Sequence, residues 1–276
     1  MRYGNPGAYS PARLLPFPIG MNSVNPFDLL SVSARAPHAI HKDDTKRETK
    51  RIRQELVGLQ ERLYAENQRS VLVVLQGMDA SGKDGLIRKV FSGINPQGVR
   101  VQPFKEPTAE ELAHDFLWRI HQHTPRHGMI QVFNRSHYED VLITRVLGLV
   151  TAGEARRRFT AINAFEKLLQ QAGTTILKFY LHISEQEQHE RLQEREQDPN
   201  KQWKYEAGDA DKARQWPRYR AVYADVFRHC SPPGCPWHLV PADQNWYKAH
   251  VVARTLRDAL LAMNPQFPPN KKARPR

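Results

Sequence analysis

Apolar positions along the chain follow two different periods, and their alternation predicts an α/β fold. Apolar residues recur at helical spacing in several segments, as in Ile52, Leu56, Leu59 and Leu63. Short apolar runs typical of buried strands lie between such segments. These runs are 71–76, 99–104, 129–133, 175–183 and 237–240. Strands that alternate with helices form a mainly parallel sheet, so we expect a three-layer α/β/α fold around five strands.

Ser or Thr followed three residues later by Glu marks predicted helix starts, because the two side chains satisfy free N–H groups of the first turn. Such capping boxes are expected at Thr45 with Glu48, Thr108 with Glu111, Ser136 with Glu139, and Ser184 with Glu187. The Thr108 pair is predicted to open one helix that carries Leu112, Phe116 and Ile120 on one face.

The chain divides into three parts by composition. Residues 1–42 are rich in Pro, Gly, Ser and Asn and are expected to form an irregular extension. Residues 43–265 are expected to make one domain, and residues 266–276 are expected to form a basic flexible tail. The sequence has no apolar span of about twenty residues and no signal segment, so we expect a cytoplasmic protein without a membrane partner.

The net charge of +12 at pH 7 favours an anionic partner without identifying one, because the basic residues are spread along the chain. The tryptophans lie inside predicted elements, so no open surface for stacking nucleic-acid bases is expected. His121 and His123 point to different sides of a helix, and we assign no metal to the histidines. Cys230 and Cys235 flank a turn, and we expect them to bind no metal.

The strand at 71–76 runs directly into a glycine loop, Gly77-Met78-Asp79-Ala80-Ser81-Gly82-Lys83-Asp84-Gly85. This loop fits the P-loop pattern, in which backbone N–H groups surround phosphate oxygens and the lysine reaches the transferred group. Asp84 replaces the usual Ser or Thr and is expected to start a helix. A carboxylate beside phosphates repels them unless a cation lies between the two. We therefore interpret Asp79 as a Mg²⁺ ligand or as the base for the attacking oxygen. The alternative is a plain strand-to-helix turn.

A second polar segment follows the third strand: Asn134-Arg135-Ser136-His137-Tyr138-Glu139-Asp140. Open parallel sheets bind ligands at this edge. Arg135 can hold phosphate oxygens and offset the charge of the phosphoryl group in transfer, although a salt bridge with an acidic neighbour is the alternative. Glu139 is either a helix cap or a metal ligand, and Asp140 is no better constrained.

Residues 184–220 are predicted to form a helical lid. Glu187, Glu190 and Glu194 fall on one stripe of a helix, and Arg191 and Arg195 form the next stripe. A cationic edge of this kind can close on an anionic ligand. Ordinary pairing of charges four residues apart on a solvated helix explains the same spacing, and the spacing alone favours it.

The glycine loop and the Asn134–Asp140 segment closely resemble the polyphosphate kinase 2 family, and the resemblance extends over about residues 43–262. It implies a P-loop kinase-like fold with a helical lid. It also implies transfer of a terminal phosphoryl group between inorganic polyphosphate and nucleoside mono- or diphosphates (AMP, ADP, GMP, GDP), with Mg²⁺ or alternatively Mn²⁺. We expect a homo-oligomer, either a dimer or a tetramer.

The resemblance also implies roles for single residues. Asp79 would be the loop carboxylate near the metal, Lys83 the P-loop lysine and Arg135 the arginine of the second motif. Phosphate or nucleotide contacts are expected at Gly77, Met78, Ala80, Ser81, Gly82, Asp84, Gly85, Asn134 and Glu139. Polyphosphate contacts are expected at Arg88, Lys89, Arg191, Arg195, Lys201 and Lys204.

Two departures from the family pattern bear on these roles. Asn134 stands where other branches carry Asp, which moves the search for a second metal ligand to Glu139 or Asp140. Asn245 stands where relatives often carry Lys, a loss for which Lys248 could compensate. Two other functions stay open: an ATP-dependent nucleotide or small-metabolite kinase, and a basic nucleic-acid-binding protein without catalysis.

Overall fold

The computed structural model describes residues 29, 31–199, 202 and 215–269, and its centre is a five-stranded sheet. Every strand pairing is parallel, and the strand order is β2-β3-β1-β4-β5. Each strand lies within one residue of its predicted bounds, which confirms the α/β expectation. The strands are β1 Ser70–Gln76, β2 Val99–Pro103, β3 Ile130–Asn134, β4 Thr174–His182 and β5 Trp237–Pro241.

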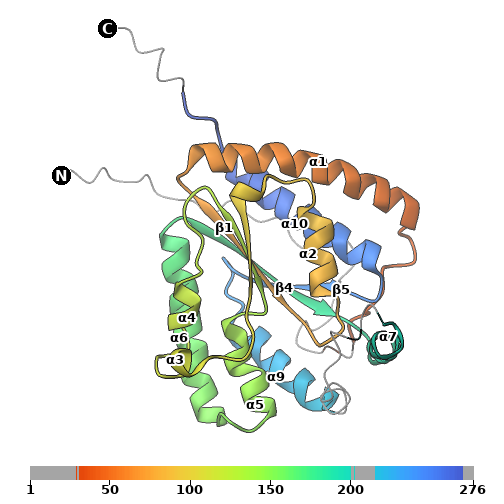
Figure 1. Cartoon of the computed structure of the whole chain (residues 1–276), viewed down its shortest axis with the longest axis vertical. Coiled ribbons are helices and arrows are strands. Elements are labelled where there is room, and N and C mark those ends of the chain that lie inside the picture. The colour runs from red at the N-terminus through yellow and green to blue at the C-terminus, as the bar shows by residue number, and fades with distance from the viewer. Residues whose placement is uncertain (1–28, 30, 200–201, 203–214, 270–276) are drawn as a thin grey trace, which may run out of the picture.

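Helices cover both faces of the sheet and make the expected three layers (Figure 1). One face carries α1 Lys42–Glu66, α2 Lys83–Phe91 and α10 Asn245–Met263. The other carries α5 Ile143–Val146, α6 Ala152–Gln171 and α9 Trp216–His229, and α7 Glu185–Gln197 lies beyond the carboxyl ends of the strands. The short elements are η1 Pro96–Gly98, α3 Ala109–Leu112, α4 Trp118–His121 and η2 His137–Val141.

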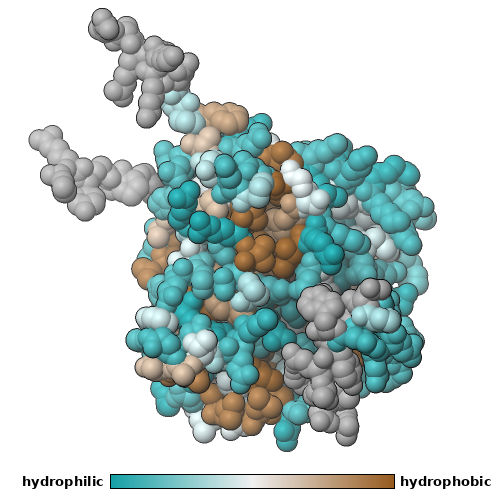
Figure 2. All heavy atoms as spheres, viewed as in Figure 1, coloured by the Kyte–Doolittle hydropathy of each residue, from teal (hydrophilic) through white to brown (hydrophobic). Residues whose placement is uncertain are grey.

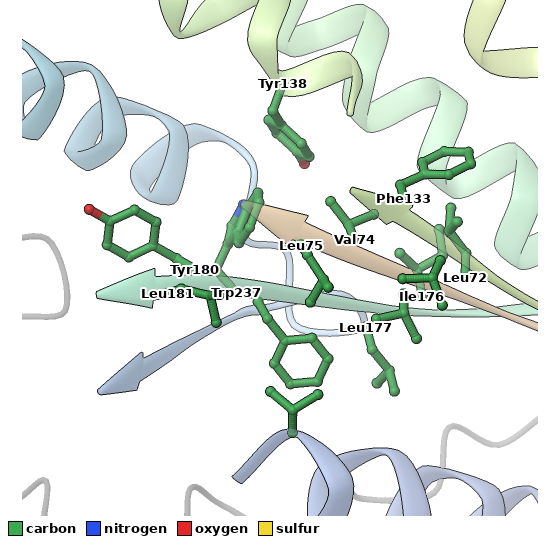
Figure 3. Close-up of a cluster of buried hydrophobic side chains, with 14 of the residues drawn as sticks. Leu72, Val74, Leu75, Phe133, Tyr138, Ile176, Leu177, Tyr180, Leu181 and Trp237 are labelled. Atoms are coloured by element: carbon green, nitrogen blue, oxygen red, sulfur yellow. The ribbon is translucent and has the colours of Figure 1, made fainter. Parts of the chain in front are cut away.

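The core is built around β1, the central strand, in which every side chain is buried. Strands covered by helices on both faces have continuous apolar sequences, and Val71–Leu75 is such a run. Figure 3 shows Tyr138, Tyr180 and Trp237 among the aliphatic side chains of this cluster. The buried strand gives the loop that follows it a rigid support.

Two predicted helix starts need correction. Helix α1 begins at Lys42, so Thr45 lies inside it, and its hydroxyl donates to the carbonyl of His41 at 2.8 Å. The predicted capping box of Thr45 with Glu48 is therefore wrong. The helix extends further upstream because Asp43 and Asp44 in its first turn favour the positive end of the dipole.

The capping box of Thr108 with Glu111 is confirmed, but the helix that it opens ends at Leu112. A separate helix, α4, carries Ile120. The carboxylate of Asp115 accepts a hydrogen bond from the N–H of Leu117 at 2.9 Å, a local turn that competes with the helix. The predicted continuous apolar face is therefore wrong, and Leu112 is exposed.

Ser136 and Glu139 do not form the predicted capping box. The hydroxyl of Ser136 accepts from the N–H of Tyr138 at 3.2 Å and opens η2, a short 3₁₀ helix. Glu139 instead accepts a hydrogen bond from Gln76 Nε2 at 3.2 Å, which directs its carboxylate toward the end of β1. Ser184 does cap α7, because its hydroxyl accepts from the N–H of Glu187 at 3.2 Å.

Hydrophilic side chains cover most of the face shown in Figure 2, with hydrophobic side chains gathered near its centre and lower edge. Across the residues that the structure describes, no helix has both the length and the apolar character needed to cross a bilayer. Cys230 and Cys235 are both free thiols inside the protein.

Candidate active site

The loop between β1 and α2 has the backbone shape of a phosphate-binding loop. Gly82 adopts a left-handed conformation (φ 86°) that favours glycine, and a Cβ added there would also displace the Nζ of Lys248. Ala80 is also left-handed (φ 60°). Helix α2 begins at Lys83, whose Nζ donates to the carbonyl of Gly77 at 2.8 Å. The loop N–H groups therefore precede a helix N-terminus, where anions bind favourably.

The second polar segment lies beside this loop because β1 and β3 are neighbours in the sheet. Leu75 pairs with Asn134, so both strands end at the same edge, and the N–H of Arg135 donates to the carbonyl of Leu75 at 3.1 Å. The crossover to β2 runs to one side of β1 and the later crossover to β4 runs to the other. Ligands of open α/β sheets bind at such a switch point.

Arg135 and Asp79 meet at this point. The Nη2 atom of Arg135 lies 3.0 Å from Oδ1 of Asp79, so the salt bridge considered as an alternative from the sequence is present. The side chains are 39% and 25% exposed. Both side chains are thus partly exposed, and a ligand at this edge of the sheet can reach them. The ion pair joins the P-loop to the residue after β3.

The charges at the loop shift the pKa values of both cations. Burial and the nearby Arg135 lower the pKa of Lys83 to about 8, against the carboxylates of Asp79, Glu139 and Asp84, which raise it. Burial would lower the pKa of Arg135, but the carboxylates of Glu139 and Asp79 raise it overall. Both cations are thus surrounded by acids, and Lys83 would gain further charge stabilisation from a phosphate.

Asn134, Asp84 and Glu139 also converge on the loop. The side-chain amide of Asn134 donates to Oδ1 of Asp84 at 2.8 Å. Asp140 faces elsewhere: its carboxylate lies 3.9 Å from Arg158. Burial and, less strongly, the charge of Glu139 raise the pKa of Asp140 to about 6, against the lowering charges of Arg119 and Arg158. Asp140 is therefore paired with Arg158, and Asp79 with Arg135.

The oxygen atoms near the loop suit Mg²⁺. Asp79 and Glu139 act electrostatically on the same two cations, Lys83 and Arg135. Oε1 of Gln76, beside Glu139, is buried and has no hydrogen-bond partner among the described residues. Among the described residues, no group of three or more His, Cys, Asp or Glu side chains is arranged to hold a metal ion. Mg²⁺ commonly needs only one or two carboxylates and takes its remaining ligands from water and substrate phosphates.

Arg191, expected as a lid cation, is turned inward onto the P-loop. Its side chain is 13% exposed, and its Nε pairs with Glu187 at 2.8 Å, the four-residue spacing considered as the alternative. Its Nη1 donates to the carbonyl of Ala80 at 3.0 Å. Arg195 lies half-buried one turn further along α7, and Arg88 and Lys89 are exposed on α2. Lys201 and Lys204 lie outside the described residues.

Several residues near the loop were not expected from the sequence. The phenols of Tyr219 and Tyr223 on α9 have raised pKa values, first through burial and then through acids that include Glu139. Gln188 on α7 donates to the carbonyl of Asp79 at 2.8 Å. Lys248, named only as a substitute for a missing cation, is buried and donates to the carbonyl of Ser81 at 2.7 Å. A signal for it exists, since Lys248 shares one helical row with Val252, Leu256 and Leu260.

Comparison with known proteins gives a consistent result. The model of the family described as Polyphosphate kinase 2 matches residues 39–268. A relative from Meiothermus ruber, named AMP/ADP-polyphosphate phosphotransferase, is 52% identical over 213 residues, which cover 77% of this chain and 80% of that protein. A relative from Rhodopseudomonas palustris, named ADP-polyphosphate phosphotransferase, is 40% identical over 231 residues, 79% of this chain and 80% of that protein.

A solved structure agrees with these relatives. The crystal structure of Polyphosphate Kinase 2 from Arthrobacter aurescens TC1 superposes with a TM-score of 0.86 at 41% identity, and the match covers 90% of each chain. The family match at residues 39–268 spans all five strands and the P-loop. The chain belongs to the polyphosphate kinase 2 family.

Proposed function

We propose that this chain transfers the terminal phosphoryl group of inorganic polyphosphate to a nucleoside mono- or diphosphate, in a reaction that depends on Mg²⁺. The relatives named as AMP/ADP- and ADP-polyphosphate phosphotransferases support this substrate class. The observation that carries the proposal is the ion pair of Asp79 and Arg135 across a P-loop. An acid inside the loop and an arginine opposite it suit a site where two phosphate chains must approach each other.

The chain's own residues mainly position two anions and offset their repulsion. The loop N–H groups and Lys83 hold the phosphates of one substrate, and Lys83 can leave the carbonyl of Gly77 to do so. Arg135 faces the transferred group and offsets the charge that develops on it. Asp79 orients the attacking phosphate oxygen or holds the cation, and either role requires its carboxylate at the loop mouth.

Mg²⁺, or Mn²⁺ in its place, would be held by Asp79, with Glu139 as the second carboxylate and Asp140 as a less favoured one. The ion would neutralise phosphate charge and polarise the transferred group. In this proposal Arg195, Arg88, Lys89, Lys201 and Lys204 contact the polyphosphate chain. We further propose that the protein is cytoplasmic and acts as a homo-oligomer.

One assay tests the function. Purified protein with Mg²⁺ and long-chain polyphosphate is incubated separately with AMP, ADP, GMP and GDP, and the products are separated by chromatography. We expect formation of the next higher phosphate from at least one acceptor. Parallel reactions with ATP in place of polyphosphate test the rival ATP-dependent kinase.

The controls make the result specific. Lys83→Ala should abolish most of the transfer, whereas Lys167→Ala, an exposed lysine on α6, should leave it unchanged. Transfer from ATP to a nucleotide or metabolite together with inert polyphosphate would reject the proposed donor. Steeply salt-dependent binding of DNA or RNA without any transfer would reject catalysis altogether.

A further inference from the structure

Three consecutive carbonyls of the P-loop accept hydrogen bonds from side chains that are distant in the sequence. Gln188 and Arg191 come from α7, and Lys248 comes from α10. The bonds are Gln188 Nε2 to Asp79 O at 2.8 Å, Arg191 Nη1 to Ala80 O at 3.0 Å and Lys248 Nζ to Ser81 O at 2.7 Å. Three side-chain donors from two helices therefore fix the orientation of these loop carbonyls.

Arg191 has all three guanidinium nitrogens in use. Its Nε pairs with Glu187 at 2.8 Å, and its Nη2 donates to the carbonyls of Ala242 at 3.0 Å and Asp243 at 2.6 Å. With the bond to Ala80, one side chain joins α7, the P-loop and the segment after β5. A guanidinium in this position cannot grip a polyphosphate chain unless these bonds break, and breaking them would leave carbonyls without partners.

Gln188 is oriented by a fourth element. The indole N–H of Trp216, at the start of α9, donates to Oε1 of Gln188 at 2.5 Å. The amide oxygen is thereby fixed toward Trp216, so the amide nitrogen must face the carbonyl of Asp79. The direction of the Asp79 peptide group thus depends on packing between α7 and α9.

The direction of these carbonyls decides how the loop meets a phosphate. In a trans peptide the C=O and the following N–H point in opposite directions, so the donors on the carbonyls of Asp79 and Ser81 turn the N–H groups of Ala80 and Gly82 the other way. The N–H of Ser81, which follows the Ala80 carbonyl, donates to the carbonyl of Met78 at 3.1 Å, so the bond from Arg191 to Ala80 holds the turn from Met78 to Ser81. Loop N–H groups that face inward bind phosphate oxygens, and carbonyls facing inward would repel them. Donors fixed before the substrate arrives remove the cost of arranging these dipoles during the reaction.

We propose that Gln188 and Arg191 are positioning residues for phosphoryl transfer, acting through the P-loop peptide groups and making no contact with polyphosphate. The inference rests on the proposed function for the identity of the substrate. It reassigns Arg191 from a ligand-binding cation of the lid to a support of the loop.

The peptide bond between Ala80 and Ser81 offers a direct measurement, because the chain contains one Ala-Ser step. Protein labelled with carbonyl-¹³C alanine and ¹⁵N serine gives one two-dimensional NMR signal for this peptide. The signal is recorded without substrate in the wild type, Arg191→Met and Gln188→Met, and then during titration with tripolyphosphate. Gln193→Met, the same change at an exposed position of α7, is the matched control.

We expect the signal to move in Arg191→Met before any substrate is added, and to respond more weakly to tripolyphosphate in both variants than in the wild type. Turnover should fall on the order of 10- to 100-fold in both, as for other residues that orient a directly acting group. The fold-loss of turnover should be the same with tripolyphosphate as with long-chain polyphosphate. Gln193→Met should match the wild type throughout.

Two results would overturn the inference: an unmoved Ala80–Ser81 signal in Arg191→Met, or a loss that appears only with the long-chain donor, which would mark direct contact. Arg191→Lys keeps the positive charge but has one donor nitrogen in place of three. This variant replaces Arg191→Met in the experiment if Arg191→Met unfolds. An inactive wild type whose signal still depends on Arg191 and responds to tripolyphosphate would reject the proposed transfer and leave the positioning role in place.

Discussion

Asp79 and Arg135 lie 3.0 Å apart, although 56 residues separate them along the chain. One comes from the P-loop after β1 and the other from the residue after β3, and the parallel pairing of those strands brings them together. Asp79→Asn keeps the shape of the side chain and removes its charge. We expect turnover to fall on the order of 10²-fold or more, about 2.7 kcal/mol, measured with polyphosphate and ADP. Asp258→Asn on the exposed surface of α10 is the control, and wild-type turnover in Asp79→Asn would reject the role of Asp79.

Lys83→Ala removes the cation that faces the loop carbonyls. Because the proposed function places this lysine against the phosphates of one substrate, we expect a loss of turnover on the order of 10²-fold or more with every acceptor. Steady-state rates with AMP and with ADP measure it. Equal rates for Lys83→Ala and Lys167→Ala would contradict the assignment.

Metal dependence should require substrate. Asp79 and Glu139 alone provide too few ligands for a tight Mg²⁺ site, so Mg²⁺ added to the free protein should barely change the thermal unfolding midpoint. Mg²⁺ added together with tripolyphosphate should raise the midpoint clearly, and a chelator should abolish turnover. A large shift caused by Mg²⁺ alone would point to a preformed metal site that the described residues do not show.

Lys178 and Glu166 form a buried ion pair under the second motif. Lys178 Nζ lies 2.6 Å from Oε2 of Glu166, and the hydroxyl of Tyr138 donates to Oε1 at 2.7 Å. Lys178→Met leaves a buried carboxylate without its cation, so we expect a loss of about 3–5 kcal/mol in the free energy of unfolding. Denaturant unfolding measures it. Lys178→Met combined with Glu166→Gln should recover part of the loss, and a single variant as stable as the wild type would show that the pair is not needed.

Stability should depend on pH through Lys248. Burial and the charges of Arg191, Lys89 and Lys83 lower its pKa from 10.5 to about 7, and Glu187 partly opposes them. Between these two values the unfolded chain binds more protons than the native protein, so the contribution of Lys248 to stability rises with pH. We expect the wild type to gain free energy of unfolding relative to Lys248→Met from about pH 7 to about pH 10. A difference that does not change with pH would show that Lys248 titrates normally.

The sequence was sufficient for the sheet and for the P-loop, because both depend on local features. A continuous apolar run such as Val71–Leu75 is stable only when covered on both faces, and Gly82 before Lys83 permits only a few backbone shapes. Helix starts were less certain. The same Ser or Thr with Glu spacing caps a helix at Thr108 and opens a 3₁₀ turn at Ser136, where Glu139 finds the distant partner Gln76.

The partners of the loop were decided by tertiary structure. Helical spacing placed Arg191 on a cationic stripe of α7, but it cannot tell whether that stripe faces solvent or the loop. The packing of α7 against the end of the sheet turns Arg191 and Gln188 onto loop carbonyls, and α10 brings Lys248 to the same place. Buried carbonyls need donors, and the chain provides them from whatever elements the fold brings close. Local sequence therefore determines that a phosphate loop forms, and long-range packing determines which side chains hold it in shape.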